Sequence, residues 1–279
     1  MWGDNMDFSV KDFNVRLRTI KLWEAAIAMV VCFVLTFFFC SYFGIMDEDL
    51  EYIIYFVFMI LFFVAVSIGT DGFRKDFDTL FSGLTPFKVI ILAVLNNLFA
   101  LSIAGLISNN IISVNNFVLP FVDIGGLISP YINAMGIDST FAFVLEVVSA
   151  VCIAPVSEEL LFRAVLFNRI KIKKGVFWGM LISSLLFSVG HFYGPQPYVH
   201  LFTSFMFGLL MCVFYLKYDN ILMNITVHLL GNLMLYIHDY TPLFDFIYYD
   251  PFNGIIGLVA LFSLLFVPVY IFYYAVKLK

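Results

Sequence analysis

The sequence contains eight long apolar stretches, and this feature restricts the possible folds more than any other. They cover about residues 22–43, 52–70, 87–107, 140–156, 175–192, 199–216, 221–237 and 253–276. A helix of roughly 20 apolar residues crosses the ~30 Å hydrocarbon layer of a membrane. We therefore predict an all-α polytopic membrane protein. About eight transmembrane helices would form a single bundle, and residues 1–279 would form one membrane-embedded domain.

The composition agrees with this prediction and argues against a soluble protein. Hydrophobic residues make up 62% of the chain and charged residues only 13%, whereas soluble proteins contain about 25% charged residues. The four cysteines, Cys32, Cys40, Cys152 and Cys212, lie within apolar runs and have no spacing typical of disulfides or zinc sites. The first apolar run follows too many charges for a cleaved signal peptide, so we expect it to remain as a membrane anchor.

The basic residues predict the orientation of the chain in the membrane. All 15 Lys and Arg residues lie near alternate connections between the apolar stretches, or before the first and after the last of them. The other connections are neutral or acidic, for example GIMDEDLE and HDYTPLFDFIYYD. Basic residues are enriched on the cytoplasmic side of membrane proteins. We therefore expect a multi-pass protein of a bacterial cell membrane, with both termini in the cytoplasm.

Ionisable residues within the apolar stretches require an explanation, because a charge at the centre of a transmembrane helix costs about 2.5–3.5 kcal/mol. Glu24 and Glu146 are isolated, and Asn96 and Asn97 could form hydrogen bonds between helices. For these four residues we favour polar packing or an interfacial position. The other polar residues gather in the segments SEELLFR, FSVGH and HLLGN, which contain Glu158, Glu159, Arg163, Phe187, His191, His228 and Asn232.

Helical spacing separates the two adjacent glutamates. Glu159 and Arg163 are four residues apart, so they can form an ion pair on one face of a helix. Glu158 points about 100° away around the helix and is left to act as a general base. Pro155 interrupts the preceding helix and leaves backbone groups that need other partners. These features favour a functional site over an ordinary transmembrane helix.

The histidines complete a candidate hydrolytic site. His228 and Asn232 are also four residues apart, so both side chains can donate hydrogen bonds to one point. His191 lies on the next predicted helix after Glu158, which runs antiparallel to it. The predicted stretches place Glu158 near the inner end of one helix and His191 near the outer end of the next. Either the helix of Glu158 starts deeper in the membrane or the predicted boundaries shift.

Other readings of these residues remain open. Each histidine alone could be a satisfied polar group of the core. The chain could be a non-catalytic immunity or scaffold protein, or a transporter that uses buried charges as a proton relay. A metallopeptidase could use His191, His228 and a glutamate as metal ligands, although the sequence has no HExxH motif. We expect no metal in the site.

The three motifs resemble those of the CPBP family of intramembrane glutamic endopeptidases, which contains CAAX proteases and bacteriocin-processing Abi proteins. EExxxR, FxxxH and HxxxN occur here in the family's order, and the resemblance covers about residues 140–238, the expected catalytic core. It implies hydrolysis of a lipidated or hydrophobic membrane-associated peptide. It also implies that Glu158 and His191 activate water, that His228 and Asn232 stabilise the oxyanion, and that Glu159, Arg163 and Phe187 shape the site. We expect the lipid bilayer and the peptide substrate as partners, and no cofactor and no nucleic acid.

Overall fold

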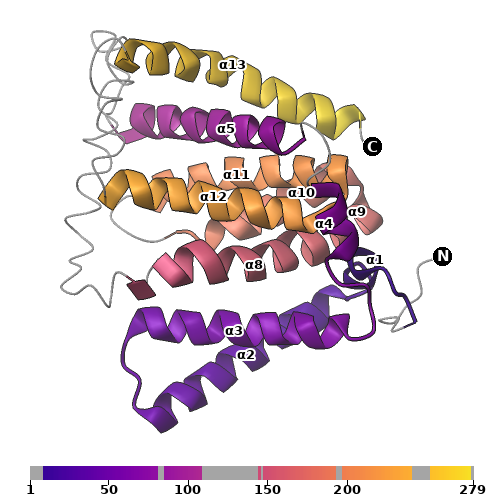
Figure 1. Cartoon of the computed structure of the whole chain (residues 1–279). Helices are drawn as coiled ribbons and strands as arrows, with labels where there is room; N and C mark the ends of the chain where they lie inside the picture. Colours follow the sequence, from indigo (N-terminus) through magenta and orange to yellow (C-terminus); the bar gives the residue numbers. More distant parts are fainter. Residues whose placement is uncertain are drawn as a thin grey trace.

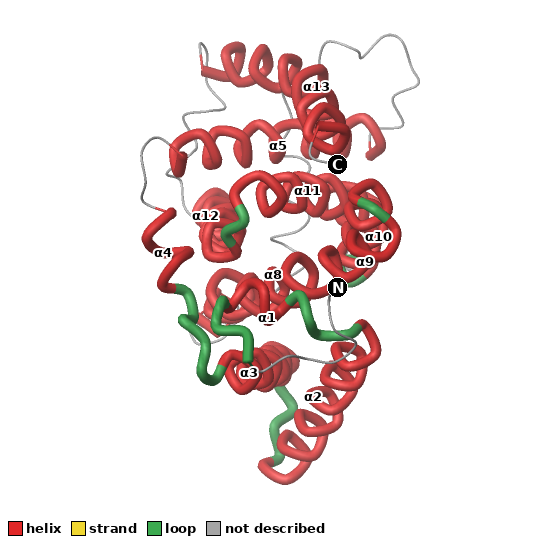
Figure 2. Tube along the Cα trace, turned by 90° about the vertical axis from the view of Figure 1, so that its right-hand side faces the viewer, coloured by secondary structure: helices red, strands yellow, loops and turns green. Residues whose placement is uncertain are grey.

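The computed structural model describes residues 9–80, 85–108, 144–145, 147–192, 197–240 and 252–277, and all regular elements in these ranges are helices. The long helices run roughly along one direction and form a bundle (Figure 1). Seen from its end, α2 and α3 lie on one side of the bundle and α13 on the other, with α8, α10, α11 and α12 between them (Figure 2). The predicted all-α architecture is confirmed.

The helices of the bundle have the following bounds. They are α2 (Leu22–Phe43), α3 (Glu48–Ser67), α5 (Thr85–Ser108), α8 (Ala154–Glu159), α9 (Asn168–Lys174), α10 (Val176–Val189), α11 (Pro197–Tyr218), α12 (Ile221–Tyr240) and α13 (Phe252–Lys277). Two short helices, α1 (Phe13–Leu17) and α4 (Arg74–Leu80), lie at one end of the bundle.

Four helices in the described part of the chain are long and apolar enough to cross a membrane by themselves. They are Leu22–Phe43, Leu50–Ser67, His200–Tyr218 and Gly257–Lys277. Two shorter apolar helices, Val176–Val189 and Ile221–Met234, accompany them. The chain is an integral membrane protein, and the exact number of eight membrane crossings remains a prediction.

The fourth predicted stretch has the wrong boundaries. Instead of ending at residue 156, the chain continues as one helical rod through π-helical η2 (Val148–Ile153), α8, π-helical η3 (Leu160–Phe167) and α9 to Lys174. Residues 140–143 and 146 lie outside the described residues. The prediction from hydropathy placed the end of this stretch too early, because the charges that follow residue 156 are buried in the bundle rather than exposed to water.

The longer rod resolves the question of depth. Gly175, with a φ of +90° that favours glycine, turns the chain from α9 into the antiparallel helix α10. Glu158 lies 17 residues before this turn and His191 lies 16 residues after it, so both reach a similar depth in the bundle. The rings of Phe162 and Phe187, which lie at matching distances from the turn, are 5.3 Å apart and support this register.

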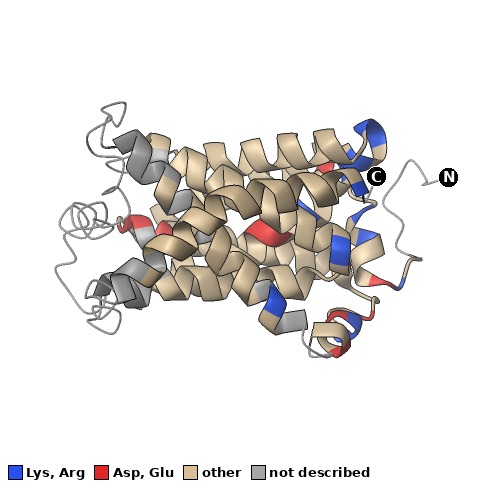
Figure 3. Cartoon of the chain, turned by 90° about the horizontal axis from the view of Figure 1, so that it is seen from above, with Lys and Arg blue, Asp and Glu red and all other residues tan. Residues whose placement is uncertain are grey.

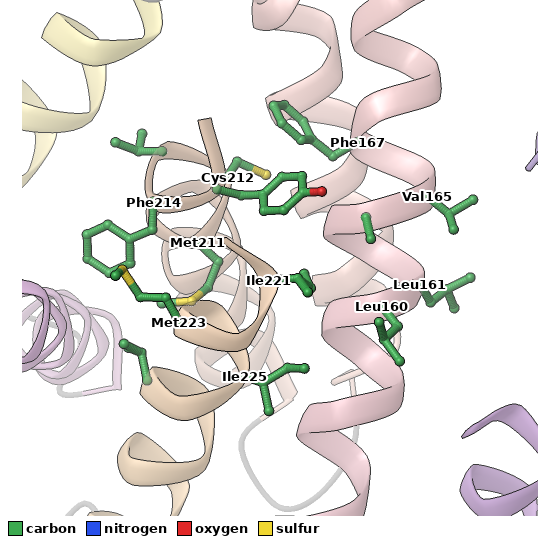
Figure 4. Close-up of a cluster of buried hydrophobic side chains, with 14 of the residues drawn as sticks. Leu160, Leu161, Val165, Phe167, Met211, Cys212, Phe214, Ile221, Met223 and Ile225 are labelled. Atoms are coloured by element: carbon green, nitrogen blue, oxygen red, sulfur yellow. The ribbon is translucent and has the colours of Figure 1, made fainter. Parts of the chain in front are cut away.

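The centre of the bundle is an apolar core between η3, α11 and α12. These helices contribute buried side chains that meet in one cluster (Figure 4), among them Leu160, Leu161, Val165, Phe167, Met211, Cys212, Phe214, Ile221, Met223 and Ile225. In a membrane, close packing rather than water exclusion holds helices together. This core fixes the relative positions of the three helices that surround the site.

A polar network closes the end of the bundle where α1 and α4 lie. The buried Arg16 of α1 donates hydrogen bonds to the carbonyls of Val66 and Ile68 at the end of α3. Asp76 of α4 accepts hydrogen bonds from Asn14 Nδ2 at 2.8 Å and from the backbone N–H of Ile221 at 3.2 Å. The first residue of α12 is therefore held by a carboxylate from another helix.

Most Lys and Arg residues gather at this same end of the bundle, where α13 also ends (Figure 3). The first described residues, which lead into α1, lie at this end as well. The two ends of the described chain thus lie on one side, as the distribution of basic residues predicts. That this side faces the cytoplasm remains a prediction.

The structure describes two of the four side chains that the sequence analysis found isolated in apolar stretches. Glu24 lies in the first turn of α2, where its carboxylate accepts a hydrogen bond from the N–H of Lys21 and caps the helix; its interfacial position remains a prediction. Asn96 is fully buried and its side chain has no hydrogen-bond partner among the described residues, so the suggested bond between helices remains a prediction for it. Glu146 and the side chain of Asn97 lie outside the described residues.

Candidate active site

A fully buried ion pair lies at the middle of the helical rod. Glu159 Oε1 and Arg163 Nη1 are 3.1 Å apart, and neither side chain is exposed. The Arg163 guanidinium also lies 4.3 Å from the centre of the Phe187 ring on α10, in a cation–π arrangement. The predicted i,i+4 pair therefore forms, and Phe187 packs against its positive member.

Glu158 points away from this pair, as the helical spacing predicts. Its side chain is 15% exposed, whereas that of Glu159 is completely buried. It faces His228 of α12, with 3.7 Å between Glu158 Oε2 and His228 Nε2. The two adjacent glutamates thus have different environments, one tied to arginine and one at an accessible edge of the site.

His228 lies between the two glutamates. Its Nδ1 is 2.9 Å from Glu159 Oε1 while its Nε2 faces Glu158. Aromatic rings flank the imidazole, with ring centres at 4.8 Å for Phe207 and 5.9 Å for Phe187. The sequence places His228 near Asn232 but does not show that it contacts Glu159.

Asn232 occupies a position that Pro155 creates. In η2 the N–H of Ala154 bonds to the carbonyl of Ser149, five residues back. The next N–H in this register would serve the carbonyl of Ala150, but residue 155 is a proline and has none. Asn232 Nδ2 donates to that carbonyl at 2.7 Å. The backbone acceptor left by the proline is thus satisfied by a side chain of the candidate site.

His191 completes the group at the end of α10. Its Nδ1 lies 2.9 Å from the carbonyl of Phe187, which can only accept, so Nδ1 carries the hydrogen in this contact. Its ring centre is 4.4 Å from that of Phe187. Because the Phe187 ring also contacts His228 and Arg163, it forms a shared wall of the site.

Asn224 belongs to this site, and sequence reasoning missed it. This buried residue of α12 donates from Nδ2 to Glu159 Oε2 at 3.2 Å and to the carbonyl of Met211 at 2.9 Å. One signal could have revealed it, because Asn224, His228 and Asn232 recur every four residues and so share one helical face.

The carboxylate of Glu159 already has partners within the protein. Glu159, which could serve as a ligand, is already bonded to Arg163, His228 and Asn224. Within the described residues, no three His, Cys, Asp or Glu side chains are grouped so that they could hold a metal ion.

Comparison with protein families places this geometry in context. Residues 140–234 match the family model described as Type II CAAX prenyl endopeptidase Rce1-like. This segment is Rce1-like. The Rce1-like segment contains all three motifs, and the resemblance to CAAX proteases predicted from them is confirmed. Searches of curated proteins and of solved structures gave no match to the chain.

Proposed function

We propose that this protein is an intramembrane endopeptidase that hydrolyses a peptide bond of a lipidated or hydrophobic membrane-associated substrate. The Rce1-like segment supports an intramembrane protease at the level of the family. One observation carries the finer proposal. Arg163 pairs with Glu159, and the adjacent Glu158 is left at the accessible edge of the site beside a histidine.

In the proposed reaction Glu158 and His191 activate the attacking water. Glu158 accepts one proton from the water while the water oxygen bonds to the carbonyl carbon of the scissile peptide. Because His191 Nδ1 carries the hydrogen in its contact with the Phe187 carbonyl, Nε2 of the neutral ring has the lone pair that would accept a hydrogen bond from the water and orient it. When the intermediate collapses, the C–N bond breaks and Glu158 returns its proton to the leaving amine.

His228 and Asn232 stabilise the negative oxygen of the tetrahedral intermediate. The Asn232 amide has two hydrogens, and its bond to the Ala150 carbonyl uses one and orients the other. His228 donates from Nε2 when its ring is doubly protonated, and the adjacent Glu159 carboxylate balances that charge. Donors held in place before the reaction stabilise the transition state without further rearrangement.

Cleavage of hydrophobic peptides by purified wild-type protein and by Glu158→Gln tests this function. We expect the variant to lose cleavage of both farnesylated and unlipidated probes while its thermal unfolding stays close to that of wild type, because Glu158 acts in the transition state. Comparing membrane peptides in cells that express each form would identify natural substrates. Cleavage that survives in the variant would refute the role of Glu158 as the general base. An absence of cleavage by the wild-type protein would instead favour the alternative of a non-catalytic scaffold or immunity protein.

A second pair of variants separates this mechanism from a metallopeptidase. Asn232→Asp would place a carboxylate beside the Ala150 carbonyl and beside the developing oxyanion, so we expect it to be less active than Asn232→Ala. Removing one oxyanion donor typically lowers kcat about 10²- to 10³-fold. Activity that a chelator abolishes, or higher activity for Asn232→Asp, would support a metal site instead.

A further inference from the structure

We propose that Asn224 is a positioning residue that controls which nitrogen of His228 carries the exchangeable proton. It does so by holding the carboxylate of Glu159 in one orientation. This inference rests on the proposed hydrolase function, but it concerns a residue outside the three motifs and makes a prediction about His228 that needs no substrate.

The contacts of Glu159 define the orientation of its carboxylate. Oε1 forms an ion pair with Arg163 Nη1 at 3.1 Å and accepts a hydrogen bond from His228 Nδ1 at 2.9 Å. Oε2 accepts a hydrogen bond from Asn224 Nδ2 at 3.2 Å. Asn224 is itself anchored, since the same Nδ2 donates to the carbonyl of Met211 on α11. Both oxygens of the carboxylate therefore accept a hydrogen bond from α12, Oε1 from His228 and Oε2 from Asn224.

This arrangement determines the proton position on His228. The guanidinium of Arg163 is always charged, so Glu159 pairs with it as a carboxylate, which can only accept hydrogen bonds. Nδ1 of His228 must then be a donor. The proton on Nε2, which faces Glu158, is the one that can come and go. A neutral His228 protonated only on Nε2 would direct a lone pair at the carboxylate, which is unfavourable.

Loss of Asn224 would release this orientation. Glu159 Oε2 would have no donor among the described residues, and the carboxylate could rotate to place both oxygens on Arg163 in the bidentate geometry that arginine favours. That rotation withdraws Oε1 from His228 Nδ1. The neutral imidazole could then take either tautomer. The doubly protonated ring, which is the form that donates to the oxyanion from Nε2, would lose the carboxylate contact that stabilises its charge.

Packing alone does not explain an asparagine at this position. Residue 224 is fully buried, and its Oδ1 has no hydrogen-bond partner among the described residues. A buried acceptor without a partner destabilises a fold, whereas an apolar side chain of similar size avoids this penalty. The two bonds from Nδ2 are thus made at the expense of an unsatisfied oxygen, which is consistent with a role in the site.

Nitrogen NMR of histidine-labelled full-length protein in lipid nanodiscs tests the inference directly. The chain has only four histidines, and His228→Gln would assign the signal of His228. In wild type we expect Nδ1 to be the protonated nitrogen of the neutral His228 ring, because it faces the Glu159 carboxylate. In Asn224→Leu we expect a smaller Nδ1-protonated fraction. We also expect kcat to fall about 10- to 100-fold with KM little changed, as for other residues that orient a catalytic group.

Asn168→Leu is the matched control. Asn168 is equally buried, and its Nδ2 donates to the carbonyls of Arg163 and Ala164 at 3.2 and 3.0 Å. Its Oδ1 has no hydrogen-bond partner in the described part of the chain, as for Asn224. The control removes two hydrogen bonds of the same kind from a residue that does not contact the Glu159 carboxylate. It should change stability without altering the His228 signals or the ratio of kcat to KM.

The outcomes separate this inference from the proposed function. A wild-type His228 with an unprotonated Nδ1 overturns the inference, even if Asn224→Leu does not fold. A folded Asn224→Leu with unchanged His228 signals and unchanged kcat also overturns it. The expected tautomer in a protein that cleaves no peptide would uphold the positioning role and instead remove the hydrolase proposal.

Discussion

Replacing Pro155 with alanine should make the protein more stable and less active at the same time. The substitution supplies an N–H in the register that would serve the Ala150 carbonyl, which now accepts a hydrogen bond from Asn232 at 2.7 Å. The backbone donor would compete with the amide for this acceptor. Asn232 would then lose the contact that orients it toward the reacting carbonyl.

The expected gain in stability follows from three contributions. A proline within a helix costs up to ~3 kcal/mol, which includes about 0.5–1.5 kcal/mol for the missing backbone hydrogen bond. The π-helical turn and the Asn232 bond to the Ala150 carbonyl already relieve part of this cost. The greater freedom of alanine in the unfolded chain offsets about 0.4–1 kcal/mol. We expect a net stabilisation of the order of 1–2 kcal/mol.

The expected loss of activity has an upper bound set by the oxyanion donor. Complete removal of such a donor lowers kcat about 10²- to 10³-fold. Since Pro155→Ala leaves Asn232 present but displaced, we expect a loss of roughly 10- to 100-fold. Thermal unfolding in detergent and cleavage of a hydrophobic peptide by the same preparation would measure both effects.

A double variant tests whether the effect passes through Asn232. If it does, Pro155→Ala combined with Asn232→Ala should be no less active than Asn232→Ala alone, because the two changes act on one contact. Additive losses would show that Pro155 affects catalysis by another route. A Pro155→Ala protein that is less stable than wild type, or fully active, would refute the assignment of the Ala150 carbonyl as the acceptor for which Pro155 has no N–H.

Three further predictions concern charge. Arg163→Met should lower stability by about 3–5 kcal/mol, because it leaves Glu159 buried without its cation. The double variant Arg163→Met with Glu159→Gln should be more stable than Arg163→Met alone. The opposite order in thermal unfolding would argue against the ion pair between Glu159 and Arg163. Burial raises the pKa of Asp76 from 3.8 to about 6, so the folded state binds its proton more tightly and the stability it contributes falls as pH rises from about 4 to 6. Wild type should therefore lose stability relative to Asp76→Asn over this range. The same pH dependence of the melting temperature in both proteins would contradict this. With native cysteines removed, single cysteines at Asp47 and Lys174 should label from opposite sides of the membrane, with Lys174 cytoplasmic; labelling from one side would refute the predicted topology.

The sequence alone determined the features that depend on local periodicity. Long apolar runs require helices in a membrane, because every backbone polar group must be bonded within the segment. The spacing of Glu159 and Arg163 made their ion pair predictable, and it also directed Glu158 to a different environment. These relations hold within one helix, whose geometry is the same wherever the helix packs.

The tertiary structure decided which groups meet across helices. Hydropathy ended the fourth stretch near residue 156, but the rod continues to Lys174 because Glu159 and Arg163 neutralise each other and Phe187 packs against the guanidinium. Nothing in the sequence indicates that His228 bonds to Glu159, since this requires the register of α12 against α8. That register comes from the packing of many side chains and from the capping of α12 by Asp76. The sequence could identify the polar groups that need partners inside the membrane, but only the packed bundle selects the partner of each one.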